Sequence, residues 1–481
     1  MPYATLAEFL AELHDSGELV RIAAPVDSAL ELAAITDRAV RSNPAGSPAL
    51  LFENVKKTTI PVVTNLMGSE RRLCLCLGVS DLDEISGELD RRLLQEQPGG
   101  WLDALKLAPG WAGLGKWSPK PVKTAPCQQV VRLGRDVNLW DLPIPRSWPD
   151  EQYPVITAGH LSVRHPVSGK TLVCRSPLAV TGPLELAWYN STDEQSAIIN
   201  AAIESKQNLP VAISLGGDPV LSLASAMPNI DNPLLFAGLL RGAGIEVVRC
   251  RTNELEVPAG SEIVIEGYLD AANPVSAMPI SVARGNGRYV CRALPLIQVT
   301  AITQRANPVL PATIVSAPPG EESWIARAAE RMMLPLLKRL VPDIVDIHQP
   351  FSGAGRNLMF VSIRKSVGHQ ARRVLHSLWG MPSVGSTKII VVVDAEIDVR
   401  QEDQVWLTVG NNACPVRDFI RSDGLLRDDD YTSLTESLAS RVGIDATRKI
   451  HGESERAWPK SLVTSAEMAD RINERWNEFG L

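Results

Sequence analysis

One short segment of the chain combines residue types that bind anions. The run Lys170-Thr-Leu-Val-Cys-Arg175 is typical of a strand, and a turn containing Pro166 and Gly169 joins it to an earlier strand that follows Pro154. An arginine at the end of an apolar strand has two interpretations. Its guanidinium is either exposed at an edge, or it points into a cleft and binds a carboxylate or phosphate through two parallel hydrogen bonds. The residues alone leave both open.

The cysteines and histidines form no recognisable metal motif. There are seven of each, no Cys-x-x-Cys pair occurs, and Cys74 and Cys76 are one residue too close for a zinc knuckle. The histidines show no His-x-x-x-His spacing. The glycine-rich run 238–244 does not match the dinucleotide fingerprint, and there is no Walker loop. We therefore expect buried structural thiols in a reducing compartment.

Composition limits the class of protein. The 481 residues include 48 Lys and Arg against 55 Asp and Glu, which gives a net charge of −7. This mild acidity disfavours nucleic-acid binding. No apolar run approaches the length of a membrane-spanning helix, and the first residues lack the pattern of a signal peptide. The expectation is a soluble cytoplasmic protein with no membrane partner.

The elements that must position Arg175 fall into three regions with different patterns. Residues 1–115 mix amphipathic helices with short apolar strands, which indicates an α/β unit. Residues 116–320 carry many short strands separated by turn residues, typical of an antiparallel split β-barrel. Residues 321–481 return to an α/β pattern and end in a terminal helix whose apolar stripe docks either on its own chain or on a partner subunit. The fold class is therefore α/β or α+β, with three domains.

The chain resembles the UbiD family of reversible decarboxylases, which use prenylated flavin mononucleotide. The matching runs occur in the same order along nearly the whole chain: 9–13, 17–22, 34–38, 49–54, 68–72, 236–242, 256–268, 299–302, 312–314, 334–337, 387–394, 415–418 and 443–447. The resemblance implies an N-terminal α/β domain, a central split barrel that binds flavin and a C-terminal α/β domain that mediates oligomerisation. These agree with the three regions above.

The resemblance also implies site residues, and several of the expected ones are missing. Arg175 matches the catalytic arginine, but Lys170 replaces the asparagine that ligates a divalent metal in the family. The other two ligands, a histidine and a glutamate, would fall near Ser191 and Pro233. A manganese or magnesium ion is therefore doubtful, and Lys170 is expected to meet the flavin phosphate instead.

The family's two acid–base carboxylates are missing as well. They belong to a loop that here spans 271–285, holds no carboxylate and places Arg284 near the expected proton donor. Arg284 is thus a candidate catalytic residue beside Arg175, although an arginine is a poor acid. The alternatives for the proton donor, which the sequence leaves open, are a water molecule, Asp270, Glu266, Tyr268 and Cys174. The remaining positions expected at the cofactor, with a potassium ion possible, are Val173, Cys174, Trp188, Ser225, Met227 and Lys388.

Three functions remain open at this point. The first is a non-standard decarboxylase of an aromatic or α,β-unsaturated carboxylic acid that uses prenylated FMN. The second is a catalytically silent subunit beside an active paralogue, and the third is a UbiD scaffold with different chemistry. The expected partners are a carboxylic acid substrate, a flavin prenyltransferase that supplies the cofactor, and further copies of the chain in a homodimer or homohexamer.

Overall fold

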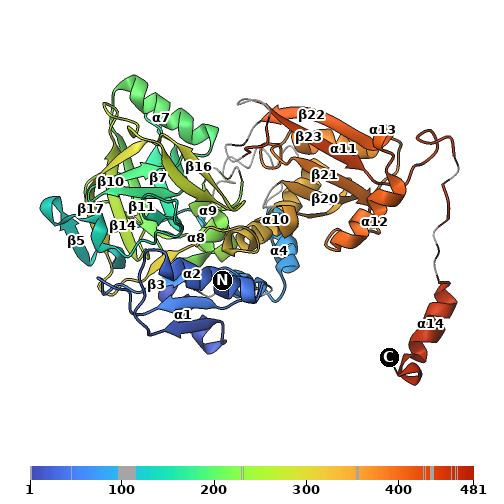
Figure 1. Ribbon diagram of the computed structural model, residues 1–481, viewed down its shortest axis with the longest axis horizontal. Helices are drawn as coiled ribbons and strands as arrows, with labels where there is room; N and C mark the ends of the chain where they lie inside the picture. The colour runs from blue at the N-terminus through green and yellow to red at the C-terminus, as the bar shows by residue number, and fades with distance from the viewer. Residues whose placement is uncertain are drawn as a thin grey trace.

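A computed structural model provides the coordinates of the protein (Figure 1). It describes residues 3–44, 46–95, 115–228, 230, 232–353, 357–425, 427, 430–433, 438–456, 458–460, 462 and 464–480. The expected boundary at 115/116 follows residues 96–114, which lie outside this part. No helix among the described residues is long and apolar enough to cross a membrane.

The N-terminal region packs helices against a small sheet. Its elements are α1 (Leu6–Asp15), β1 (Leu19–Ile22), α2 (Glu31–Ser42), β2 (Ala49–Phe52), β3 (Val62–Thr64), α3 (Glu70–Leu77) and α4 (Leu82–Gln95). Helix α1 begins at a capping box, in which Thr5 and Glu8 satisfy each other's backbone amides, and it buries one apolar face. The fourth strand of this sheet is β18 (Leu310–Ala312), which pairs with β3 in parallel. A segment 250 residues further along the chain therefore completes the sheet.

The central region is built on a curled sheet (Figure 1). Its strands run in the order β6-β9-β10-β17-β14-β11-β7-β8, and β5 also pairs with β17. They are β5 (Val130–Leu133), β6 (Val155–Ile156), β7 (Gly159–Arg164), β8 (Thr171–Arg175), β9 (Leu178–Gly182), β10 (Glu185–Trp188), β11 (Leu209–Leu215), β14 (Ile263–Leu269) and β17 (Leu296–Gln304). The pairings are antiparallel, as the short alternating runs predict. This curled half-barrel confirms the predicted fold class.

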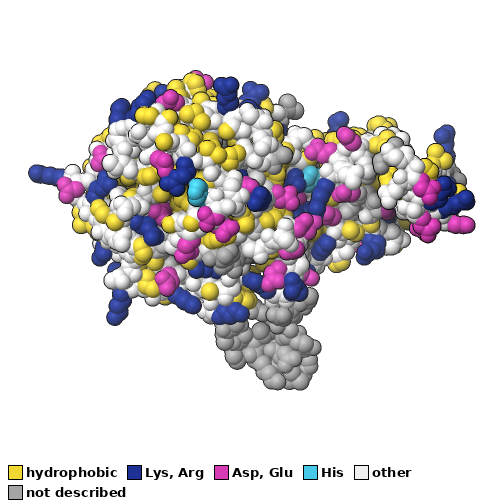
Figure 2. Space-filling view, turned by 90° about the horizontal axis from the view of Figure 1, so that it is seen from below, with side chains coloured by type: hydrophobic (Ala, Val, Ile, Leu, Met, Phe, Trp, Pro, Cys, Tyr) yellow, Lys and Arg dark blue, Asp and Glu magenta, His cyan; other side chains and the backbone are white. Residues whose placement is uncertain are grey.

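Smaller elements surround the curled sheet. The helices are α7 (Asp193–Ser205), α8 (Pro219–Ala224) and α9 (Pro233–Arg241). The remaining strands are β4 (Lys120–Val122), β12 (Glu246–Arg249), β13 (Glu256–Pro258), β15 (Ile280–Arg284) and β16 (Arg288–Arg292). On the face seen in Figure 2, basic and acidic side chains are interspersed among hydrophobic ones.

The C-terminal region is a sheet covered by helices. Its elements are α10 (Glu321–Leu340), β19 (Ile344–His348), β20 (Leu358–Ile363), α11 (Gln370–Trp379), β21 (Ile389–Asp394), α12 (Glu402–Asn412), α13 (Pro415–Asp418), β22 (Phe419–Leu425) and β23 (Leu438–Asp445). Its strands run in the order β19-β20-β21-β23-β22, with β20, β21 and β23 parallel. Alternate residues of β21 pack toward α11 and toward α12, so both faces of this strand are buried.

Helix α10 connects the three regions. One hydrophobic core contains residues of α1, α3 and α4, of α8 and α9, of α10, and of β20 and β21. The last helix, α14 (Ala466–Glu474), stands away from the body of the molecule and has no buried residue (Figure 1). Of the two docking modes predicted for the terminal stripe, docking on its own chain is therefore not what this structure shows.

Candidate active site around Arg175

A small, partly open pocket lies where strand β8, helix α8 and the first turn of α10 meet. Its polar groups include the side chains of Arg175, Asp218 and Glu321, and Leu66, Met67 and Ile325 contribute to its apolar wall. These residues belong to the N-terminal, central and C-terminal regions alike. Only the shared core around α10 brings them together, so the pocket is a product of the whole fold.

Arg175 ends strand β8 and lines this pocket. Its Nη2 donates to the carbonyl of Thr157 and to the hydroxyl of Thr313, both at 3.4 Å. These bonds are long, and a guanidinium has five N–H donors. Within the described residues Arg175 therefore keeps donors for a further acceptor, and of the two interpretations the geometry favours the guanidinium aimed into a cleft.

Glu321 faces the same pocket from the first turn of α10 and is only 6% exposed. Its Oε1 accepts the amide of Met67 at 2.9 Å, and its Oε2 has no hydrogen-bond partner among the described residues. Burial raises the pKa of this carboxyl, while the Met67 amide, the charge of Arg175, the neighbouring Thr313 hydroxyl and the charge of Arg72 act in the opposite direction. The pocket thus holds a buried carboxyl group with one uncommitted oxygen.

Asp218 is the second carboxylate of the pocket, and its oxygens are both engaged. Oδ1 caps helix α8 by accepting the amide of Val220 at 3.0 Å, and Oδ2 accepts from Nη1 of Arg241 at 2.9 Å. Burial raises the pKa of Asp218 from 3.8 to about 6, and the charge of Arg241 opposes the shift. This residue is held in place by structural contacts.

His160 lies directly across the β7–β8 hairpin from Arg175. It is buried, and neither ring nitrogen has a hydrogen-bond partner among the described residues. Burial lowers the pKa of His160 to about 3, and the charge of Arg175 adds to the effect. The imidazole is therefore neutral, and it adds no second positive charge beside Arg175.

Sequence reasoning missed Glu321, Asp218 and His160. For His160 a signal existed, because a hairpin that turns between residues 166 and 169 places residue 160 opposite residue 175. The other two come from segments distant in sequence, and nothing in their own surroundings marks them.

Lys170, predicted at the flavin phosphate, and Lys388, predicted near the cofactor, lie away from the pocket. Lys170, at the opposite end of β8 from Arg175, is half-exposed and pairs with Glu194 at 3.3 Å. Lys388 belongs to the C-terminal region and pairs with Asp430 at 2.5 Å. The remaining cofactor positions, Val173, Cys174, Trp188, Ser225 and Met227, are wholly or partly buried.

Several of these buried side chains already have structural contacts. Ser225 caps the C-terminal end of helix α8, and its hydroxyl donates to the carbonyl of Leu221 at 2.6 Å. Burial raises the pKa of the Cys174 thiol to about 11, so the thiol stays protonated at neutral pH. Trp188 is fully buried in a hydrophobic core. These positions stay predictions as cofactor contacts.

Arg284 is not part of the pocket lining. It lies on the β15–β16 hairpin, where its guanidinium covers the ring of the buried Tyr189 at 4.6 Å from the centroid. Arg292 stacks on the same ring at 4.8 Å. The structure therefore does not bring the two predicted catalytic arginines together within this pocket.

The residues present do not fit the divalent metal that the resemblance to the UbiD family implies. Positions 170, 191 and 233 carry a lysine, a serine and a proline, none of which offers the expected ligands. Across the described residues no group of three or more His, Cys, Asp or Glu side chains is placed to hold a metal ion. No step of a mechanism is assigned to such a metal.

Comparison with known proteins identifies the family. Three family models match in order along the chain: the N-terminal domain of 3-octaprenyl-4-hydroxybenzoate carboxy-lyase at residues 10–89, its Rift-related domain at 120–318 and its C-terminal domain at 323–446. These models cover most of the sequence. The chain belongs to the UbiD family.

Relatives of this UbiD chain extend over its whole length. A protein of Aquifex aeolicus (strain VF5) is 37% identical over 486 residues, which is 100% of this chain and 99% of the relative. The UbiD-class enzyme HmfF from Pelotomaculum thermopropionicum, in complex with FMN, is 27% identical with a TM-score of 0.77 and covers 97% of this chain and 99% of its own. An evolved dimeric form of HmfF has been solved with prFMN at 26% identity, 97% and 98% coverage and the same TM-score.

A third similarity supports the fold alone. Vanillic acid decarboxylase of Sedimentibacter hydroxybenzoicus in its closed form is 23% identical, covers 100% of this chain and 99% of its own, and has a TM-score of 0.86. The predicted family and three-domain fold class are thus confirmed. The roles of individual residues in this UbiD chain are a separate question.

Proposed function

We propose that this UbiD chain is a reversible decarboxylase of an aromatic or α,β-unsaturated carboxylic acid, and that it uses prenylated FMN. The observation that carries the proposal is Arg175, whose guanidinium faces a partly apolar pocket with only two long hydrogen bonds. A guanidinium with spare donors in such a place binds a carboxylate well. Family membership and the flavin-containing structures of HmfF support the same reaction class.

Strand β8 offers cationic side chains at both ends for a flavin mononucleotide. Lys170 directly precedes β8 and Arg175 ends it, about 17 Å away. Because side chains alternate along a strand, Lys170 points toward α7 and Arg175 toward the pocket on the opposite face. The pair between Lys170 and Glu194 is half-exposed, so exchanging Glu194 for a phosphate costs about 1 kcal/mol or less. In this proposal the flavin spans the edge of β8, with Lys170 at the phosphate and with Val173, Ser225 and Met227, on the pocket side, at the ring. The prenylated flavin supplies the electron sink of the reaction.

The residues of the chain position the substrate. Arg175 binds its carboxylate, and Leu66, Met67 and Ile325 contact its apolar body. Asp218 holds the start of α8 at the pocket wall. These apolar side chains reduce the contact of the bound carboxylate with water and so strengthen its interaction with Arg175.

A catalytically silent UbiD-like subunit is a second candidate. Two observations favour it: Glu194 places a carboxylate beside the lysine assigned to the phosphate, and loop 271–285 carries no acid–base residue. In that case the chain would assemble with an active paralogue, and its own pocket would turn over no substrate.

The test is to co-express the chain with a flavin prenyltransferase and to measure the bound cofactor by absorbance and mass spectrometry. The holoenzyme is then assayed for CO₂ release from a panel of aromatic and unsaturated acids. Arg175→Ala should lose at least about 100-fold in kcat/KM, while Arg164→Ala, an exposed arginine on the neighbouring strand β7, should retain activity. Protein that takes up no flavin, or that turns over no acid of the panel, would count against the decarboxylase and for the silent subunit.

A further inference from the structure

We propose that Glu321 is the proton-transferring residue of this pocket and takes over the role of the carboxylates absent from loop 271–285. This inference rests on the proposed decarboxylase function and deepens it. The geometry points to Glu321 because its Oε2 is buried, unpartnered within the described residues and directed at the pocket that Arg175 lines. A buried carboxylate oxygen without a partner is costly in a folded protein unless it serves a ligand or a reaction.

The other acidic groups nearby are less suitable. Asp218 has both oxygens committed, one to the cap of α8 and one to Arg241. Glu322, the next residue on α10, does not line the pocket, and its Oε2 lies against Gly285 in the β15–β16 turn. The Cys174 thiol contacts the hydroxyl of Ser176 at 3.9 Å and is not part of the lining. Glu321 is therefore the pocket carboxyl group with a free oxygen.

The surroundings of Glu321 favour its protonated form. Burial raises the pKa of its carboxyl, and the positive charges that oppose this shift are Arg175 on β8 and Arg72 on α3. Arg72 is itself paired with Glu18 at 2.9 Å. Across the pocket, Asp218 is paired with Arg241 and His160 is neutral. When a substrate carboxylate neutralises Arg175, the protonated form of Glu321 is favoured further.

The reaction balances with this one residue and the flavin electron sink. In decarboxylation the bond between the carboxylate and its carbon breaks, CO₂ leaves, and the electron pair stays on the carbon; a bound prenylated flavin would supply the electron sink. The proton of Glu321 Oε2–H then forms the new C–H bond, and Glu321 is left as a carboxylate. Water at the pocket mouth returns the proton to it. In the reverse direction the Glu321 carboxylate accepts the proton from the C–H bond.

The experiment compares Glu321→Gln, Glu321→Asp and the matched control Glu322→Gln in the flavin-loaded enzyme. Glu321→Gln should lower kcat by about 10²–10⁴-fold with little change in KM, because a positioned acid contributes that much. It should also abolish the loss of decarboxylation at high pH, where wild-type Glu321 is deprotonated. Glu321→Asp should restore part of the activity, and Glu322→Gln should keep it.

A second readout does not depend on turnover. Benzoate binding to flavin-free protein is measured by calorimetry in two buffers of different ionisation enthalpy, which reports proton uptake. At a pH where Glu321 of the free protein is partly deprotonated, wild type should take up a proton on binding and Glu321→Gln should not. Unchanged uptake in Glu321→Gln, or an active wild type whose kcat and pH profile survive the substitution, would overturn the role of Glu321. A different outcome separates the two proposals. If flavin-loaded wild type turns over no acid, but benzoate binding still takes up a proton that Glu321→Gln does not, the decarboxylase function is overturned and Glu321 remains the proton carrier.

Discussion

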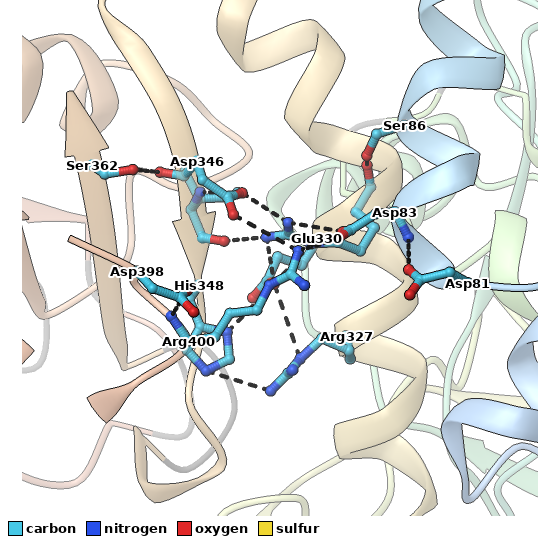
Figure 3. A network of polar contacts seen from close by, with 12 residues as sticks. Asp81, Asp83, Ser86, Arg327, Glu330, Asp346, His348, Ser362, Asp398 and Arg400 are labelled. Carbon is cyan, nitrogen blue, oxygen red and sulfur yellow. Dashed lines mark hydrogen bonds and ion pairs between the residues drawn. The ribbon is translucent and has the colours of Figure 1, made fainter. Parts of the chain in front are cut away.

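Two buried glutamates on helix α10 have opposite surroundings. Glu321, in the first turn, has one oxygen on the Met67 amide and the other without a partner in the described part of the chain. Glu330, in the middle of the helix, accepts from Arg331 at 2.8 and 3.1 Å and from the amide of Gln349, and His348 lies 3.6 Å away (Figure 3). The same residue type on one helix is thus open to a ligand at one place and fully engaged at another.

The pKa shifts follow this difference. Burial acts to raise the pKa of both carboxyls, but His348 and Arg331 outweigh it at Glu330, whose net pKa is lowered. At Glu321 burial prevails and the net pKa is raised. Burial alone therefore does not distinguish a structural carboxylate from a reactive one. What distinguishes them is whether the protein has already supplied the partners.

The ion pairs around Glu330 and Arg331 also join parts of the chain that are distant in sequence. Arg331 contacts Asp346 on β19 at 2.7 Å and Asp83 on α4 at 3.4 Å, and Arg400 binds both oxygens of Asp83 at 2.5 and 2.6 Å (Figure 3). The N-terminal helix α4 and the C-terminal sheet are thereby fixed to α10. We infer that this ion network holds α10 in place, and with it the first turn that carries Glu321.

The largest predicted effect comes from breaking the ion network. Arg331→Met should lower the free energy of unfolding by about 3–5 kcal/mol, because it removes the guanidinium that donates to the buried Glu330 at 2.8 and 3.1 Å. Arg339→Met on the same helix removes a partly exposed pair with Asp90 and should cost about 1 kcal/mol or less. Chemical denaturation measures both. Equal losses in the two variants would show that the network is no more structural than a surface pair.

The second prediction concerns Asp218, the pocket carboxylate whose two oxygens both accept hydrogen bonds. Because folding raises the pKa of Asp218 from 3.8 to about 6, the folded state holds its proton more tightly than the unfolded chain does. This group's contribution to stability is therefore fully present below about pH 4 and is lost as the pH rises to about 6, with a change of about 2–3 kcal/mol. Asp218→Asn, which can still cap α8, should flatten the pH dependence of unfolding over this interval. A pH profile identical to that of wild type would contradict the assignment.

Removing the guanidinium of Arg175 should hardly affect the free energy of unfolding. Arg175→Met deletes two hydrogen bonds of 3.4 Å and leaves a side chain of similar length against the pocket wall. We expect the free energy of unfolding to stay within about 1 kcal/mol of wild type, while turnover is lost. Thermal unfolding of flavin-free protein checks this. A loss as large as that of Arg331→Met would mean that Arg175 is structural and would remove the contrast between the two regions.

Local patterns predict much of the fold. The apolar run ending at Asp394 forms β21, the apolar run 358–363 forms β20, and the amphipathic pattern from Trp324 to Leu340 lies within α10, which has three further residues at its start. Apolar periodicity is a local property and can be read from a single segment. The pairing of β18 with β3 is not local, so the sequence pattern could not place residues 310–312 in the N-terminal sheet.

The candidate site was less predictable than the fold. Arg175 stood out because an arginine is unusual at the end of an apolar strand. Glu321 did not, since a glutamate in the first turn of a helix is expected from the helix dipole alone. Its burial depends on the N-terminal segment around Met67 and on β8. The open oxygen that makes it a candidate is a property of tertiary packing.

The smallest stability effect is expected at the outer end of β8, where it also tests the cofactor assignment. Lys170 and Glu194 form a half-exposed pair, so Glu194→Gln should change the free energy of unfolding by less than about 1 kcal/mol, and the difference should shrink in high salt. If Lys170 meets the flavin phosphate, removing the competing carboxylate should tighten FMN binding several-fold at low salt, and Lys170→Ala should weaken it. The exposed pair of Arg249 and Glu254 gives a matched control, because Glu254→Gln should leave FMN binding unchanged. FMN fluorescence titration measures all three variants. Equal affinity in Glu194→Gln and wild type would place the phosphate elsewhere and leave Arg175 as the cation of β8 that serves the pocket.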